Sequence, residues 1–274
     1  MTDRGSSIDR ILSIPRLFTE DRPVWTVEEM AQQLRLPIST TYRYFQSLIR
    51  FEYLDEAPGQ GYCLGPAFIE FERSIRVSDP MSRAAGPVMS TLAAGMPPGA
   101  LLILCRVYRK KVMCIHQQAV APVDAVISYE RGKPMPIFRG ATSKVILAHL
   151  PWRQQKREYD GNAQALSQAG LGADWKSFSS GLRDIRKQGY CISRGEVDPG
   201  RMGIAAPLFN PDGKVAHSLS AVVWQDGVDD ARAHSLAGLV VDAASRISRA
   251  LAHASPGAAG QDAPPHSSNR IENV

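Results

Sequence analysis

The segment at residues 26–49, TVEEMAQQLRLPISTTYRYFQSLI, constrains the fold more than any other part of the chain. Its first part carries apolar residues at helical spacing, namely Val27, Met30, Ala31 and Leu34. Thr26 is placed to cap this helix, and Leu36-Pro37 predicts its end. A second stripe at helical spacing follows, formed by Thr41, Tyr44, Phe45 and Leu48. The segment is therefore expected to form two short amphipathic helices joined by a tight turn.

Polar side chains occupy the side of the second helix opposite its apolar stripe. They are Ser39, Thr40, Tyr42, Arg43 and Gln46. An apolar stripe that locks a helix to its partner, combined with short polar residues at the N-terminal end, is typical of a helix that reads the major groove. These five residues are the candidate contacts to double-stranded DNA.

The flanking sequence distinguishes this interpretation from the alternative of two helices in an ordinary core. Upstream, residues 7–18 predict a third helix, which Pro15 is expected to end or kink. Downstream, two short apolar-aromatic runs at residues 51–54 and 62–64 are separated by a glycine-rich turn and predict a β-hairpin. Gln60 at its tip is the candidate wing contact to DNA. Together these elements predict a winged helix-turn-helix domain at residues 1–65.

The net charge does not by itself indicate DNA binding. The formal net charge is +5, but residues 1–65 contain seven arginines, no lysine and nine acidic residues. The positive excess lies largely in residues 79–150, which contain nine basic and three acidic residues. DNA affinity is therefore expected to come from a few placed arginines, from helix N-termini and from the pairing of subunits.

The rest of the chain is long enough for a second domain. A helical pattern at residues 67–77 precedes Ser78-Asp79-Pro80, so we expect a linker helix at 66–79, with the first helix of the next domain as the alternative. Strand patterns follow at residues 100–108, 111–118, 125–129, 189–193, 202–209 and 216–224. Helical patterns occur at residues 81–94, 141–149, 152–159, 174–188 and 230–253.

Mixed strands, hairpins and helices predict an α+β domain at residues 80–254, in which helices cover an antiparallel sheet. Residues 255–274 are small, polar and rich in proline and glycine, so a disordered tail is expected there.

Several protein classes are disfavoured. The sequence has neither a run of about 18 apolar residues nor a secretory signal, so we expect a cytoplasmic protein without membrane contact. The six histidines show no metal-ligand spacing, and we expect neither a metal nor a cofactor. The cysteines lie far apart in apolar or aromatic runs, as is typical of buried free thiols: Cys63, Cys105, Cys114 and Cys191.

From about residue 7 to about residue 249, the chain resembles the IclR-type transcriptional regulators. The N-terminal similarity lies in Ser7-Ile8-Asp9-Arg10-Ile11-Leu12, in Leu36-Pro37 followed by Ser39-Thr40 and Arg43, and in Gly61-Tyr62-Cys63-Leu64-Gly65. The C-terminal similarity lies in Gly140-Ala141-Thr142-Ser143-Lys144, Gly189-Tyr190, Gly195-Glu196, Gly200 and Ile204-Ala205-Ala206-Pro207. Pro15, Ile38 and Ser143 depart from the family pattern.

The resemblance implies a GAF-like C-terminal domain that binds a small effector, in a homodimer or homotetramer that controls a catabolic operon. Gly140 leads into a helix whose N-terminal N–H groups are expected to bind an anion. A plain helix capped by Thr142 or Ser143 is the alternative. In the family, the loop that matches Gly140-Ala141 lines the effector cavity, which favours the ligand site.

The resemblance extends the effector site to further segments. The candidate residues are Met135, Phe138, Gly140, Ala141, Thr142, Met202, Gly203, Ile204, Ser218 and Ser220. An apolar pocket with a few directed polar groups suits a small organic acid, with an aromatic carboxylate as one option.

Two alternatives compete with a ligand-controlled regulator. An enzyme would use Cys191 with Glu196 and Asp198, but no base at a defined spacing accompanies this cysteine, and we expect no enzyme activity. A redox-responsive regulator would use Cys105 and Cys114, which the spacing places across a hairpin but out of register.

Overall fold

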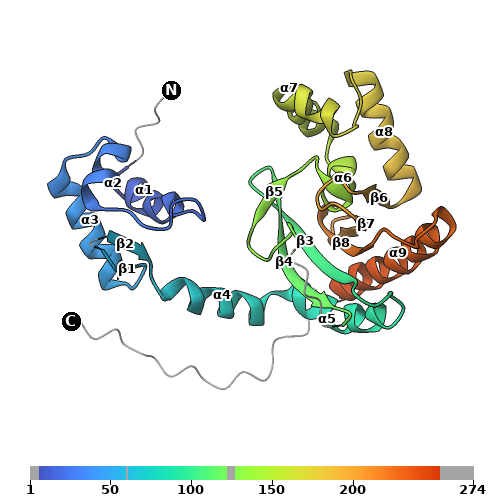
Figure 1. Cartoon of the computed structure of the whole chain (residues 1–274), viewed down its shortest axis with the longest axis horizontal. Coiled ribbons are helices and arrows are strands. Elements are labelled where there is room, and N and C mark those ends of the chain that lie inside the picture. The colour runs from blue at the N-terminus through green and yellow to red at the C-terminus, as the bar shows by residue number, and fades with distance from the viewer. Residues whose placement is uncertain (1–5, 60, 122–126, 254–274) are drawn as a thin grey trace. The chain divides into compact units, whose positions relative to one another are not determined.

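The computed structural model describes residues 6–59, 61–121 and 127–253. These residues form two compact units that divide between Ser78 and Asp79 (Figure 1). Gln60 and the predicted tail at residues 255–274 lie outside the described residues. No helix within the described ranges is long and apolar enough to cross a membrane.

The first unit is built from short helices and a hairpin. Its elements are α1 (Ser7–Ser13), the 3-10 helix η1 (Ile14–Leu17), α2 (Val27–Leu34), α3 (Ile38–Arg50), β1 (Leu54–Ala57), β2 (Gly61–Leu64) and α4 (Ala67–Ser78). Pro15 lies at the start of η1, where regular α-helical bonding stops as predicted. Thr26 and Glu29 form a capping box at the start of α2. Arg35 ends α2 in the left-handed conformation, with φ of 53°.

The predicted apolar stripes of α2 and α3 meet in the core of this unit. The buried cluster comprises Ile14, Phe18, Trp25, Val27, Met30, Phe45, Leu48 and Leu54. Thr41 is fully buried, and its hydroxyl donates to the Pro37 carbonyl at 3.2 Å, so the polar group is satisfied. The winged helix-turn-helix prediction is confirmed.

The first wing strand begins later than expected. The strand predicted to begin at residue 51 begins instead at Leu54, because α3 runs to Arg50 and the Phe51 N–H still donates to the Ser47 carbonyl. Glu52 then takes a positive φ of 56°, which turns the chain. The hairpin therefore pairs Leu54 with Leu64 and Ala57 with Gly61.

The second unit contains an antiparallel sheet whose described strands follow the order β5-β4-β3-β8-β7-β6. The strands are β3 (Leu101–Tyr108), β4 (Lys111–Ala119), β5 (Pro134–Pro136), β6 (Cys191–Arg194), β7 (Arg201–Phe209) and β8 (Val215–Trp224). This arrangement confirms the predicted α+β class.

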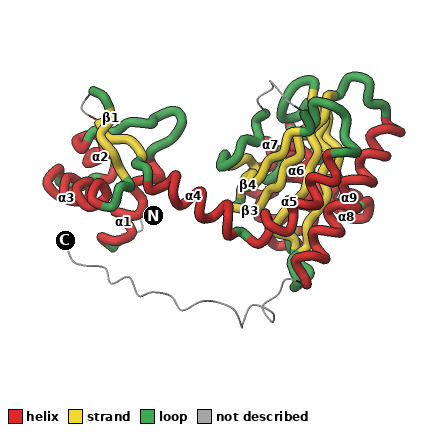
Figure 2. Tube along the Cα trace, turned by 90° about the horizontal axis from the view of Figure 1, so that it is seen from below, coloured by secondary structure: helices red, strands yellow, loops and turns green. Residues whose placement is uncertain are grey.

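Helices cover both faces of this sheet (Figure 2). One face packs against α5 (Pro80–Ala93) and α9 (Asp230–His253). The other face packs against α6 (Gly140–His149), which contacts α8 (Trp175–Gln188), and α7 (Trp152–Gln168) packs on α8. The core is thus divided into two layers, and the direction in which each sheet residue points decides which layer it joins.

Two element predictions in this unit need correction. Residues 127–129 are not a strand, and residues 125 and 126 lie outside the described residues. The helix predicted at residues 152–159 continues to Gln168 through a non-helical Asn162 with φ of −139°.

Candidate functional site

The candidate DNA-reading residues lie on the outer side of α3. Ser39, Tyr42, Arg43 and Gln46 are exposed, and Thr40 is half-buried. Among the described residues, the side chains of Ser39, Tyr42 and Arg43 make no hydrogen bond or ion pair, and the only side chain bonded to this group is that of Ser47, whose hydroxyl donates to the Arg43 backbone carbonyl. These side chains are therefore available to an external partner.

Three of these residues also line one shallow groove. Ser39, Tyr42 and Arg43 share it with Ile38 of the same helix and with Val27, Glu28 and Tyr62. Ile38 is 54% exposed, so this departure from the family pattern places an apolar side chain on the outer surface. The structure brings the recognition-helix candidates together; Gln60 lies outside the described residues.

The second candidate site surrounds the first turn of α6. Gly140 takes a φ of +75°, as an abrupt strand-to-helix turn requires. Every residue from Gly140 to Ala148 is buried, so α6 is a central helix.

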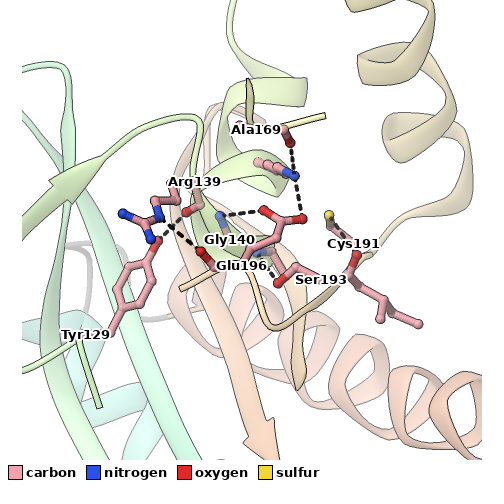
Figure 3. Close-up of polar contacts among 10 residues, drawn as sticks. Tyr129, Arg139, Gly140, Ala169, Cys191, Ser193 and Glu196 are labelled. Carbon is pink, nitrogen blue, oxygen red and sulfur yellow. Dashed lines mark hydrogen bonds and ion pairs between the residues drawn. The ribbon is translucent and has the colours of Figure 1, made fainter. Parts of the chain in front are cut away.

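The N–H groups at this N-terminus already have partners (Figure 3). Gly140 N–H donates to Glu196 Oε2 at 3.2 Å, and Ala141 N–H donates to Ser193 Oγ at 2.9 Å. Lys144 Nζ donates to Glu196 Oε1 at 2.7 Å and to the Ala169 carbonyl at 3.1 Å. The expectation that these two N–H groups are free is therefore wrong. A carboxylate does bind at the helix N-terminus, but it belongs to the protein.

The alternation of β7 corrects two predicted effector residues. Successive strand residues point to opposite faces. Met202 and Ile204 join the core layer under α5 and α9. Gly203 faces α6 instead, since a Cβ built on Gly203 would lie 3.6 Å from the Cβ of Ala141. Met202 and Ile204 thus point away from the α6 site, and the intervening Gly203 approaches it.

Ser218 and Ser220 hold α6 to the sheet. Both are fully buried on β8. Ser218 Oγ donates to the Thr142 carbonyl at 3.2 Å, and Ser220 Oγ lies 3.0 Å from Thr142 Oγ1. The predicted proximity to α6 is present, and both hydroxyls are engaged by the helix.

The two predicted apolar walls lie apart from this turn. Met135 is buried in the core layer beneath α6. Phe138 lines a neighbouring surface hollow with Arg139 and Glu196, the same Glu196 that binds the Gly140 N–H.

A small hollow of about 20 Å³ lies at the α6 N-terminus. It is lined by Tyr129, Gly140, Ala141, Thr142, Ser193, Glu196, Val197, Asp198, Arg201, Gly203 and Val222. This volume is comparable to one water molecule, so the hollow as it stands holds nothing larger. Tyr129, Ser193 and Arg201 are not among the residues predicted from sequence, although an arginine at the start of an apolar strand is a visible signal.

Arg201 has an unusual environment for a cation. It is 5% exposed, its Nη1 donates to the Gly99 carbonyl at 3.1 Å, and its guanidinium lies 3.4 Å from the centre of the Trp224 ring. Its Nη2 atom is buried and has no hydrogen-bond partner within the described residues. A buried charged donor without an acceptor is costly, and a carboxylate would satisfy it.

The loop between β6 and β7 closes the hollow. Gly195 and Gly200 flank it with φ values of 63° and 72°. Glu196 binds Lys144, and Asp198 accepts hydrogen bonds from the Ser128 N–H and hydroxyl at 3.1 and 2.6 Å. This loop therefore forms one wall of the site through side-chain contacts on both sides.

The residues considered for catalysis are buried or engaged by other side chains. Burial raises the pKa of the Cys191 thiol to about 12, which disfavours the nucleophilic thiolate. Glu196 and Asp198 are engaged by Lys144 and Ser128 instead.

Comparison with known proteins agrees with this architecture. Residues 7–58 match the IclR helix-turn-helix domain, and residues 77–249 match the bacterial transcriptional regulator IclR C-terminal domain. The HTH-type transcriptional regulator KipR of Bacillus subtilis is 24% identical over 255 residues, covering 92% of this chain and 100% of KipR.

Solved structures share the fold. An IclR transcriptional regulator from Alicyclobacillus acidocaldarius superposes with a TM-score of 0.73 at 22% identity, covering 91% of this chain and 100% of that one. An IclR homologue from Microbacterium hydrocarbonoxydans, complexed with 4-hydroxybenzoate, has a TM-score of 0.71 at 18% identity, covering 90% and 99%. The chain belongs to the IclR family of DNA-binding transcriptional regulators.

Proposed function

We propose that this regulator binds operator DNA through α3 and responds to a small organic acid that binds at the α6 hollow. The unpartnered Nη2 of buried Arg201 carries the effector part of the proposal. It marks a position where a ligand carboxylate gains a charge-assisted hydrogen bond that the described part of the protein does not supply itself. The controlled genes belong to a catabolic operon, and the protein acts in the cytoplasm without enzyme activity.

On the DNA side, Ser39, Tyr42 and Arg43 are proposed to reach base edges from the groove-forming side of α3. Thr40 and Gln46 flank them and contact phosphates or bases, and Gln60 contacts the backbone or the minor groove. The net negative charge of residues 1–65 makes one such head a weak binder, so at least two heads must act together.

The homodimer or homotetramer is proposed to use α4. This helix exposes apolar side chains that its own unit leaves uncovered: Ile69, Phe71, Ile75 and Val77. Ile69 is 74% exposed and Ile75 is 61% exposed, which is costly in water unless a second subunit covers them.

On the effector side, the acid is proposed to bind between Arg201 and the first turn of α6. Gly140, Ala141, Thr142 and Gly203 line this space, together with Tyr129 and Val222, which offer apolar surface. Ser218 and Ser220 support the turn from below. Because the hollow holds only about 20 Å³, the acid must displace Glu196 and the loop that carries it.

The coupling between the two sites is a population shift. The acid stabilises the opened form of the 195–200 loop, and that form favours a different spacing of the recognition helices in the oligomer. Repression and activation both fit this scheme.

Isothermal titration calorimetry with a panel of organic acids, including 4-hydroxybenzoate, tests the proposal. Arg201→Gln should lose most of the affinity for the acid that binds wild type, whereas Arg183→Gln, at an exposed arginine of α8, should not. Equal affinity of Arg201→Gln and wild type would remove Arg201 as the anchor. A panel in which no carboxylate binds wild type would contradict the organic-acid class.

A further inference from the structure

Cys105 on β3 and Cys114 on β4 lie directly opposite each other. The hairpin turns at Arg109 and Lys110, whose φ values of 47° and 63° are those of a two-residue type I′ turn. Counting back from Tyr108 and Lys111, the two cysteines are each three residues from the turn. The expectation that they are out of register is therefore wrong.

An irregularity in the ladder lies beyond this pair. It falls between Leu104 and Cys105, so that Leu104 pairs with His116 and Ile115 is the additional residue. The stretch between the turn and the cysteines is regular.

The register gives the cysteine pair a geometry suited to a disulfide. Hydrogen-bonded and non-hydrogen-bonded pairs alternate along an antiparallel ladder, and a two-residue turn is closed by a hydrogen-bonded pair. Cys105 and Cys114, three steps from Tyr108 and Lys111, thus occupy a non-hydrogen-bonded position. Cα atoms at such positions are about 4.5 Å apart, within the range of about 4.4–6.8 Å that disulfides span.

Both side chains point into the core layer beneath α6, where both thiols are free. Contact with the Cys105 thiol lowers the pKa of Cys114, aided by the His116 backbone and by Arg131, whereas burial raises the pKa of Cys105. Cys114 is therefore the thiol that forms a thiolate more readily.

Cys105 and Cys114 are buried, so an oxidant must reach them by local opening of the sheet edge. Along Lys111–Met113 the outer neighbour of β4 is β5, which is three residues long and includes Pro134 and Pro136. At Cys114 the outer neighbour is the segment of Arg131 and Gly132, and the Gly132 N–H donates to the Cys114 carbonyl at 3.0 Å. Prolines have no N–H to donate, so this edge is held by few hydrogen bonds and opens more easily than the sheet centre.

We propose that Cys105 and Cys114 form a reversible cross-strand disulfide when the protein meets a hydroperoxide. The Cys114 thiolate attacks a peroxide oxygen, an S–O bond forms, the O–O bond breaks, and the departing oxygen leaves as water or alcohol after taking a proton. The Cys105 sulfur then attacks the sulfenic acid, forming the S–S bond, and the hydroxyl leaves as water with the Cys105 proton. A dithiol such as dithiothreitol reverses the reaction.

The disulfide would lie close to the α6 site. Cys105 pairs with Ser218 on β8, and the Ser218 hydroxyl donates to the Thr142 carbonyl in the first turn of α6. Oxidation thereby acts on the same segment that we propose the organic acid to bind, but the disulfide itself requires no acid.

The test uses the reduced full-length protein without any organic acid. After native treatment with hydrogen peroxide, free thiols are alkylated, and trypsin then cuts at Arg106, Arg109, Lys110 and Lys111, which separates the two cysteines. We expect a linked peptide pair, lighter by two hydrogens, that disappears after dithiothreitol and is absent from Cys114→Ser. Cys63→Ser, at the partly exposed cysteine, should still form the link.

Two outcomes would overturn the proposal. One is that Cys105 and Cys114 are both still alkylated, and therefore still free thiols, after a peroxide dose that oxidises Cys63. The other is that the link forms only after unfolding in urea. Because the linked peptide pair is detected in the wild-type protein, the result remains valid even if Cys114→Ser folds poorly.

Discussion

The outer face of α3 and the α6 hollow differ in whether their polar groups already have partners within the protein. On α3, Ser39, Tyr42 and Arg43 are exposed and unengaged within the described residues. Around α6, Gly140 and Ala141 already bind Glu196 and Ser193. A partner of the first region only adds contacts, whereas a ligand of the second must replace contacts that exist. The first region is therefore suited to reading a surface, and the second to switching.

Filling the hollow should have the largest effect. Ala141 is 2% exposed and faces Gly203, so Ala141→Leu inserts a bulky side chain where we propose the acid binds. The response of operator binding to the acid should be abolished, while operator affinity without acid is retained, because the two units are separate. Overpacking costs about 1–3 kcal/mol of stability, so circular dichroism must accompany the titration.

Ala163→Leu, at an exposed alanine of α7, is the control for the substitution itself and should respond as wild type does. An undiminished acid response in Ala141→Leu would refute the placement of the pocket.

Removing an exposed contact should have a graded effect. Arg43→Ala should weaken specific operator binding by about 1–3 kcal/mol and relax sequence preference, because one base contact is lost. Electrophoretic mobility shifts at fixed salt measure this, with Arg50→Ala at the far end of α3 as control. Unchanged affinity and preference in folded Arg43→Ala would show that α3 does not read the operator.

The stability of the second unit should depend on pH through His217, which is half-buried on β8. Burial, together with Arg106, lowers the pKa of His217 to about 4, while Asp79 opposes this shift. The neutral ring is favoured in the folded state, so its contribution is complete above the unfolded value of about 6.5 and is lost as pH falls toward 4. The free energy of unfolding should fall by on the order of 1–3 kcal/mol over this pH range.

Urea unfolding between pH 7.5 and 4.5 measures this dependence. His217→Gln should flatten it, whereas His234→Gln, at an exposed histidine, should not. Identical pH profiles for wild type and His217→Gln would exclude His217 as the source.

The smallest effect on ligand binding is expected at Thr142. Its hydroxyl binds Ser220 in the core, so Thr142→Ala should cost about 1–3 kcal/mol of stability by leaving a buried hydroxyl unpaired. Acid affinity should change only about twofold, since a single neutral contact is at most indirectly lost. Thr142→Ser should restore stability. A large loss of acid affinity in stable Thr142→Ser would mean that its methyl group touches the ligand.

Local patterns in the sequence predicted the first unit well. The stripe of Thr41, Phe45 and Leu48 is a helical repeat with one apolar side, so its buried face could be assigned directly. The start of β1 was misplaced because the end of α3 depends on the backbone conformation of Glu52, which apolar spacing does not encode.

The α6 site was harder to predict. On β7, both faces are buried, so residues 202–206 show no alternation from which the direction of Met202 or Ile204 could be assigned. Tyr129, Ser193 and Arg201 come together only through sheet pairing and loop closure. The capping of α6 by Glu196, more than 50 residues away, likewise has no local signal.

The claim that a ligand at α6 must replace Glu196 is tested most directly by titrating the operator complexes of wild type and of Glu196→Gln with the acid. The substituted amide keeps an oxygen that can accept the Gly140 N–H, but it removes the charge that now pairs with Lys144. If the protein's own carboxylate competes with the effector, the variant should respond at a several-fold lower acid concentration than wild type, because one opposing ion pair is lost. An unchanged or higher midpoint in folded Glu196→Gln would contradict the account.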